Sequence, residues 1–464
     1  MKTINYILLI AVISISACED FLEEDPRSLV TVNNFYNNIG EATKGLYGSY
    51  HHLEPIYESL GVGLVTDMSA DVLEVGGGAG GSQSTFFEDF TYDAASDIVN
   101  SAYDNHYVLI NSVNTLLAQT QGNDLGDDAT QAAIEGEAKF LRGLAYFNLV
   151  RLFGGVPLRT EPTTSTEGLD LPRASEEEVY QQVIIDLSEA VAQLPEVSLE
   201  PGRANQIAAN TLLAKVQLTR QNYAEAVSAL EAVRGKRMLY EDFADNFKIE
   251  NENNTVESIF EVQYGLRPEN SNILEFLTPD AVTGFGFVFG VYKAEDELVG
   301  LFTDDDTRRA VTLWNEREGV EFGGEFIRKF SDGLVPGIQA ADAGQINYPV
   351  LRYADALLMY AEALNGQNNG PTALAYEAID EVRTRAGLSP LATGLDQTDF
   401  LETVLEERQR EFVAEGQRWF DLKRNNLLNA ELADKGFISG KNELWPIPLA
   451  ALDANESLEQ NNGY

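Results

Sequence analysis

The chain is poor in the residues on which many enzymes and metal sites depend. Among its 464 residues there is one cysteine, Cys18, and there are three histidines, His51, His52 and His106. A single cysteine excludes an intrachain disulfide and any paired-cysteine metal or redox motif. The histidines lack the spacing of a zinc site, and no GxSxG or P-loop motif occurs. We therefore expect no metal, no cofactor and no enzymatic activity.

Positive charge is also scarce. The chain has 32 lysines and arginines against 74 aspartates and glutamates, which gives a formal net charge of -42. Binding to nucleic acid is not expected, because contacts to phosphates need a basic surface. The same negative field disfavours strongly anionic ligands. A neutral ligand meets no such barrier.

Cys18 lies at the end of a short apolar segment. Lys2 supplies a positive start, residues 6–13 form an apolar run, and residues 14–17 are of the small kind that precede a cleavage site. This pattern predicts a lipoprotein signal peptide over residues 1–17 and a lipid anchor on Cys18. The run is too short to span a bilayer. The alternative is an ordinary secretory signal followed by a chance cysteine.

Helical periodicity dominates the rest of the chain and predicts a mainly α fold. One helix is expected from near Asn33 to residue 50, and another over residues 133–153, where two glycines follow. A third helix should start at the capping box formed by Ser175 and Glu178, and should end before Pro195.

Two segments share a finer pattern, in which small residues recur at similar places. Ala214 and Ala226 are separated by 12 positions in residues 209–234, and Ala361 and Ala375 by 14 positions in residues 353–385. The pattern predicts tetratricopeptide-like helical hairpins, the second with a longer turn over residues 366–371. Ordinary helical hairpins are the alternative.

Residues 61–92 and 265–344 are rich in glycine and aromatic residues, and they are predicted to be long irregular loops that carry a ligand site. An aromatic ring can stack on the C–H face of a sugar, while polar side chains bind its hydroxyl groups. An aromatic residue taken singly is more often part of the core than a ligand contact, and it is their clustering in glycine-rich segments that favours a binding site. The candidate glycan-binding residues are Asp67, Asp71, Phe86, Phe87, Tyr92, Phe287, Phe289, Tyr292, Trp314 and Arg328.

Sequence blocks along nearly the whole chain share one resemblance. They comprise residues 18–26, 142–158, 202–205, 352–355, 360–365, 407–424, 444–448 and 460–464. These blocks resemble the SusD/RagB family of outer-membrane lipoproteins of Bacteroidetes.

The resemblance implies a non-catalytic, lipid-anchored protein on the outside of the outer membrane. Such a protein binds a polysaccharide or oligosaccharide on a tetratricopeptide-like scaffold and acts as a lid on a SusC-like TonB-dependent transporter. Residues 18–464 would form one SusD-like domain, with an N-terminal part at 18–240 and a C-terminal part at 241–464. The family blocks, with Trp419 and Trp445, are expected to be scaffold, which leaves Trp314 for the binding surface.

The charge favours a neutral glycan, such as a β-glucan of the laminarin type or a fructan. Three other functions stay open at this point. They are a RagB-like subunit of a peptide importer, a surface glycosidase, and a scaffold whose repeats only hold partner proteins.

Overall fold

The computed structural model describes residues 35–76, 81–165, 168, 170–251, 256–265, 270–279, 281–282, 288–334, 340 and 344–464. Cys18, the predicted signal peptide and Phe287 lie outside these ranges. Within the described ranges, none of the helices combines the length and the apolar character needed to cross a membrane.

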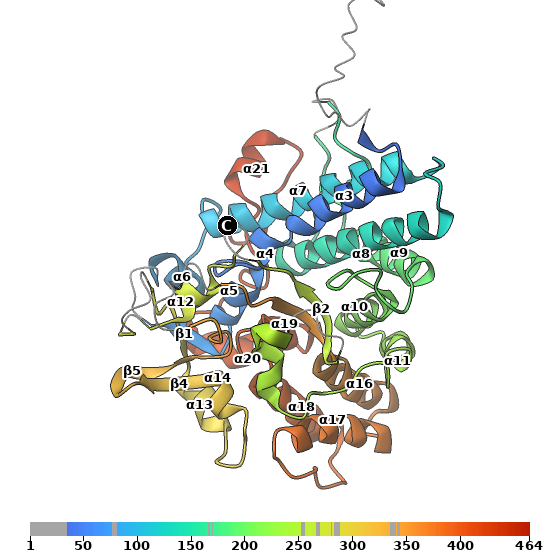
Figure 1. Cartoon of the computed structure of the whole chain (residues 1–464). Helices are drawn as coiled ribbons and strands as arrows, with labels where there is room; N and C mark the ends of the chain where they lie inside the picture. The colour runs from blue at the N-terminus through green and yellow to red at the C-terminus, as the bar shows by residue number, and fades with distance from the viewer. Residues whose placement is uncertain are drawn as a thin grey trace, which may run out of the picture.

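Helices make up most of the molecule, as the periodicity predicts (Figure 1). Those of the N-terminal part are α3 (Ile39–His51), α4 (Glu54–Tyr57), α5 (Val62–Met68), α6 (Gly81–Glu88), α7 (Asp97–Thr120), α8 (Asp128–Phe153), α9 (Glu176–Gln193), α10 (Gln206–Thr219) and α11 (Tyr223–Glu231). Those that follow are α12 (Ile273–Leu277), α13 (Asp296–Leu301), α14 (Arg309–Thr312), α16 (Tyr353–Asn368), α17 (Ala373–Arg385), α18 (Gln397–Glu411), α19 (Arg418–Arg424), α20 (Leu428–Leu432) and α21 (Leu449–Ala454). Short 3-10 helices are η1 (Phe243–Phe247), η2 (Ile249–Asn251) and η3 (Ala433–Lys435).

Local sequence signals set the ends of the long helices. Ser175 Oγ accepts the N–H of Glu178 at 3.3 Å, and Glu178 Oε2 accepts the N–H of Ser175 at 2.8 Å, so the predicted capping box at the start of α9 is confirmed. Helix α8 ends at Phe153, where Gly154 takes a positive φ of 73°. A residue without a side chain adopts this conformation readily.

The predicted helical hairpins are present as α10–α11 and α16–α17. Ala214, Ala226, Ala361 and Ala375 are all fully buried, because small side chains let the paired helices approach closely. The longer spacing in the second hairpin lies mainly in α16, which continues to Asn368, rather than in a longer turn. The helices α8, α9, α10, α11, α16 and α17 each pack on the next and form one stack on the right of Figure 1.

The strands form two antiparallel sheets. Strands β1 (Leu73–Val75), β3 (Tyr292–Ala294), β5 (Val320–Ile327) and β4 (Leu313–Arg317) lie in that order in one sheet, and β2 (Ser258–Val262) pairs with β6 (Tyr348–Arg352) in the other. The β4–β5 hairpin projects at the lower left of Figure 1. Its turn contains Glu318 and Gly319 at positive φ, and Trp314 lies opposite Phe326.

The structure differs from the prediction of an irregular loop over residues 61–92. This segment contains α5, β1 and α6. Every residue of α5 is buried, and a side chain on Gly63 would collide with the ring of Tyr348. This glycine therefore marks a close approach of backbone and ring and not a flexible loop.

Many charged residues of the family blocks lie in the interior as a network of ion pairs. Arg352 binds Glu257, Glu411 and Glu415 at 2.6, 3.0 and 2.8 Å. Neighbouring arginines, including Arg385 and Arg308, hold the pKa of Glu411 well below its usual range. Because each of these charges is compensated within the network, it can be tolerated away from water. Within the part of the chain that the structure describes, these charged residues of the blocks are therefore scaffold, as the resemblance implies.

Candidate functional site

Two of the predicted polar residues, Asp67 and Asp71, lie inside the protein. Asp67 is fully buried, and its carboxylate accepts the N–H groups of Gly416 at 2.9 Å and Arg418 at 3.3 Å. Burial raises the pKa of Asp67 to about 7. Asp71 binds the guanidinium of Arg418. Both carboxylates fasten the segment at the start of α19, and neither is presented to a ligand in this conformation.

Three of the predicted aromatic residues belong to the core. Phe87, Tyr92 and Tyr292 are 0%, 3% and 0% exposed. The rings of Phe87 and Tyr92 stack at 4.5 Å between centroids, and Phe87 also contacts Trp445 at 5.1 Å. The hydroxyl of Tyr292 donates a hydrogen bond to the carbonyl of Ser59. The three rings therefore pack within the protein core and are not available to a ligand in this structure.

Two further aromatic residues are accessible but are not gathered into one cavity. Phe86, on α6, is 51% exposed. Phe289 is half-buried, and its ring lies 4.9 Å from that of Phe276. Phe287 falls outside the described residues.

Trp314 and Arg328 line one cavity of about 470 Å³ between η1, α14, β4 and the segment after β5. The Trp314 ring is half-buried and meets the ring of Phe322 edge-on at 5.3 Å. Phe322 in turn meets Phe326 at 6.2 Å, so three rings form a row along the β4–β5 hairpin. The Arg317 guanidinium lies 5.8 Å from the Trp314 ring. Of these three rings only that of Trp314 lines the cavity, where Phe247 of η1 is the other aromatic residue.

The indole N–H of Trp314 makes no hydrogen bond to a described residue. Its nitrogen is buried and has no acceptor in the part of the chain that the structure describes. Buried donors of this kind usually find a partner.

The polar lining of the cavity carries charges of both signs. Lys248 binds Asp245 at 2.5 Å, and Asp332 accepts the N–H of Ile249 at 2.9 Å. Arg328 is exposed and donates to the carbonyl of Ala310 at 3.1 Å. Lys329 is turned inward and binds Glu415 at 2.6 Å. The cavity thus offers hydrogen-bonding groups of both charges, with Lys248, Arg317, Arg328 and Lys329 against Glu316 and Asp332. Such groups can bind the hydroxyl groups of a sugar.

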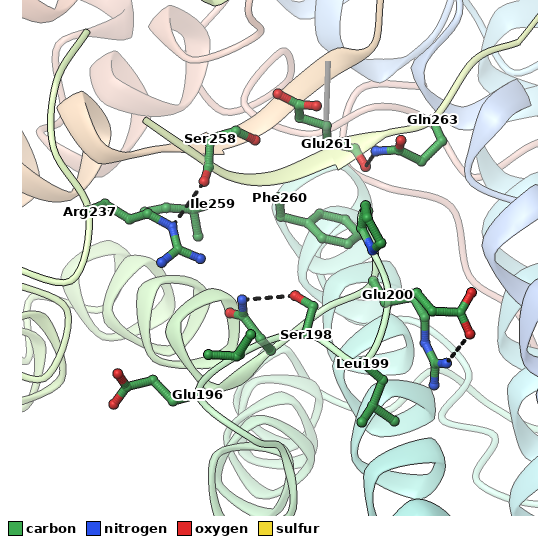
Figure 2. A pocket seen from close by; sticks show the side chains of 15 residues that line it. Glu196, Ser198, Leu199, Glu200, Arg237, Ser258, Ile259, Phe260, Glu261 and Gln263 are labelled. Carbon is green, nitrogen blue, oxygen red and sulfur yellow. Dashed lines mark hydrogen bonds and ion pairs between the residues drawn. The ribbon is translucent and has the colours of Figure 1, made fainter. Parts of the chain in front are cut away.

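A second cavity, of about 310 Å³, lies between the α9–α10 connection and β2 (Figure 2). The sequence pointed to residues 202–205 of its lining only as a family block, and it did not predict a ligand site here. Leu199 is 46% exposed, and Arg237 Nε donates to the carbonyl of Ser258 at 3.3 Å. Phe260 is only 2% exposed and packs on Phe140 at 4.8 Å, so its face is not free to stack on a sugar. The cavity beside Trp314 is therefore the stronger candidate for a glycan.

Three carboxylates, Glu74, Glu88 and Glu295, have oxygens within 4.8 Å of one another and are close enough to share a metal ion. Two ammonium groups already reach this cluster, since Lys293 binds Glu74 and Lys435 binds Glu295. The lysines supply the positive charge that an ion would bring.

Comparisons with known proteins agree over almost the full length. The family model described as "SusD family" matches residues 233–464, and the one described as "Starch-binding associating with outer membrane" matches residues 20–218. A SusD-like protein of Formosa agariphila is 29% identical, with 100% of each chain covered. The "Starch-binding protein SusD" of Bacteroides thetaiotaomicron is 26% identical over 76% of each chain.

Solved structures resemble this one closely. A structure titled "Laminarin binding SusD-like protein" is 28% identical, has a TM-score of 0.82, and the match covers 92% of this chain and 100% of that one. A SusD homologue from Bacteroides thetaiotaomicron has a TM-score of 0.85 at 24% identity, with 95% and 100% covered. The second likeness concerns the fold alone.

Proposed function

Because the chain belongs to the SusD/RagB family, we propose that it is a lipid-anchored protein of the outer cell surface that binds a neutral glycan and passes it to a SusC-like TonB-dependent transporter. The family description names starch binding and association with the outer membrane. A laminarin-binding relative with the same fold supports a β-glucan of the laminarin type as the first ligand to test, with a fructan as the second. The protein does no chemistry on the glycan.

The division into parts at residues 18–240 and 241–464 belongs to this proposal, and it is supported by two family models that end at residue 218 and begin at residue 233.

The observation that carries the glycan site is the position of Trp314. Its half-buried ring borders a cavity of about 470 Å³ that also contains the exposed Arg328. A sugar ring stacking on this indole would leave its hydroxyl groups facing the polar side of the cavity. Phe86 and Phe289 remain candidates for a more distant part of a long glycan.

Intrinsic fluorescence tests this site directly. The protein has three tryptophans, and Trp419 and Trp445 are each 1% exposed. A glycan that contacts Trp314 should change the emission of the wild-type protein in a saturable way, and Trp314→Phe should abolish that change. A signal that persists in Trp314→Phe would show that the glycan does not stack on this residue.

Calorimetric titration against laminarin, a fructan, starch and a panel of peptides separates the possible ligands. We expect heat from a neutral glycan and none from peptides. Saturable peptide binding with no glycan binding would instead support a peptide importer. The appearance of new reducing ends during incubation with a polysaccharide would support a glycosidase.

Affinity purification of the protein from membranes should recover the transporter. If the transporter is absent from the purified sample, the proposed delivery step is contradicted.

A further inference from the structure

Arg151, in the last turn of α8, is a buried cation without a carboxylate partner. It is 8% exposed, and its guanidinium lies between the rings of Phe147 and Phe420, at 3.9 and 3.7 Å from their centroids. No ion pair between described residues includes Arg151. Nε donates to the carbonyl of Phe147 at 3.2 Å, and Nη2 donates to Asn148 Oδ1 at 2.6 Å. Nη1 has no acceptor among the described residues, and it is not one of the fully buried atoms that lack a partner, so it keeps some contact with solvent. A buried guanidinium without a carboxylate partner lowers the stability of the folded protein unless another group compensates its charge.

A small cavity adjoins Arg151. Its volume is about 30 Å³, and Tyr57, Asn148, Lys215, Tyr348 and Glu415 also line it. A space of this size holds one or a few atoms, on the scale of one water molecule. It is too small for a polyatomic anion such as sulfate.

Two phenol groups at this cavity have protons for which the described residues offer no acceptor. Tyr348 is 1% exposed, and its hydroxyl has no partner among the described residues. Tyr57 is 6% exposed, and its hydroxyl accepts a hydrogen bond from Asn148 Nδ2 at 3.0 Å, so its own proton must point elsewhere. The two rings lie 5.5 Å apart. With Arg151, three donor groups surround one small space.

The other charges that line the cavity are already compensated. Lys215 Nζ donates to Asp355 at 2.9 Å and to Gln417 at 2.6 Å. Glu415 accepts from Lys329 at 2.6 Å and from Arg352 at 2.8 Å. The charge of Arg151 is therefore the one left unbalanced at this position.

We propose that the cavity bounded by Arg151, Tyr57 and Tyr348 is a binding site for a small monovalent anion such as chloride. A halide accepts hydrogen bonds from all three donors and neutralises the guanidinium. A water molecule carries no charge, so it would leave the guanidinium of Arg151 without a counterion. The bound anion would join α8, the α4 segment and β6, and it would stabilise the folded protein in saline surroundings.

Halide-dependent stability tests the site. The melting temperature should rise with chloride or bromide beyond its rise in sodium gluconate of equal ionic strength, because a ligand that binds only the folded state stabilises it by mass action. Tyr348→Phe keeps the ring and removes one donor, so it should need at least about ten-fold more halide for the same gain. Tyr146→Phe is the control, since the hydroxyl of this buried tyrosine donates to the carbonyl of Arg159 at 2.8 Å and does not line the cavity. Tyr146→Phe should retain the full halide response.

Crystals of the wild-type protein soaked in bromide provide a readout that does not depend on variants. An anomalous peak between Arg151 and the two tyrosines is expected. An equal response to halide and gluconate, or an unaltered response in Tyr348→Phe, would overturn the proposal. Density with the contacts of a water molecule and no anomalous signal would also overturn it.

Discussion

Asp71 and Arg418, which stand 347 positions apart in the sequence, form a two-pronged ion pair. Arg418 Nε lies 2.7 Å from Asp71 Oδ1, and Nη2 lies 2.6 Å from Oδ2. The side chains are 12% and 10% exposed. Paired geometry of this kind is stronger than a single charged hydrogen bond. The pair joins the segment after α5 to the first turn of α19, so it fastens the two halves of the chain together.

Replacing Asp71 by alanine should destabilise the protein and leave glycan affinity unchanged. The substitution leaves the buried Arg418 without its carboxylate, which costs about 3 kcal/mol in the free energy of unfolding. Glu177→Gln is the matched control, because Glu177 is 61% exposed in its pair with Arg220 and its loss should cost about 1 kcal/mol or less. Denaturant titration and calorimetry on the same samples measure both effects. If the Asp71→Ala protein is stable but binds glycan more weakly, Asp71 is a ligand contact and this prediction is wrong.

Trp314→Ala should show the opposite behaviour. Loss of the stacking surface should weaken glycan binding by about 2 kcal/mol, while the half-buried position limits the loss of unfolding free energy to about 1 kcal/mol. Phe87→Ala is the control for a core aromatic residue, and it should cost about 3 to 5 kcal/mol of stability without a selective effect on affinity. If Trp314→Ala is destabilised as strongly as Phe87→Ala and binds glycan normally, the site lies elsewhere.

Cys18→Ala should release the protein from the outer membrane, because acyl chains on this residue are the expected anchor. Fractionation of cells that lack the transporter is the appropriate measurement, since the transporter could retain an unlipidated protein. Metabolic labelling with a fatty acid should mark the wild type and not the variant. Retention of unlabelled Cys18→Ala protein in the membrane would contradict the lipoprotein prediction.

Asp67 should make stability depend on pH. Its pKa is raised to about 7 in the folded protein, so the folded state holds this proton more tightly than the unfolded state does. The resulting stabilisation is fully present below the unfolded pKa of about 4 and is lost as the pH rises to about 7. Asp67→Asn, which imitates the protonated form, should flatten this part of the curve of unfolding free energy against pH. Parallel curves for the wild type and the variant would exclude the effect.

Chelators should leave the melting temperature nearly unchanged, because lysines already balance the cluster of Glu74, Glu88 and Glu295. Scanning calorimetry with EDTA, then with added calcium, measures this. A large drop that calcium reverses would identify the three glutamates as a metal site, and Glu88→Gln would then be the variant to confirm it.

Local signals in the sequence predicted the helical scaffold well. The capping box at Ser175 and the small residues at Ala214 and Ala361 act over a few positions or between neighbouring helices, so spacing alone identifies them. Their predicted roles are confirmed.

The site was harder to predict, because it depends on contacts between distant parts of the chain. Phe86 and Phe87 are adjacent, yet one is 51% exposed and the other 0%, since α6 turns them to different faces. The partners of Asp67 and Asp71 lie about 350 positions away, and no local pattern reveals them. Trp314 was distinguished by its absence from the family blocks. The structure places it at one cavity with Arg328, and its role in ligand binding stays a prediction.

The β4–β5 hairpin lies apart from the buried ion pairs, and this separation bears on how ligand preference can differ between relatives. Its two ends, Leu313 and Ile327, are 3% and 1% exposed and lie opposite each other, whereas the residues between them carry the aromatic row. The interior arginines Arg308 and Arg352 lie outside this interval. If the proposed glycan site at Trp314 is correct, a change of residues between 314 and 326 would alter ligand contacts while the ion pairs of Arg308 and Arg352 stay in place.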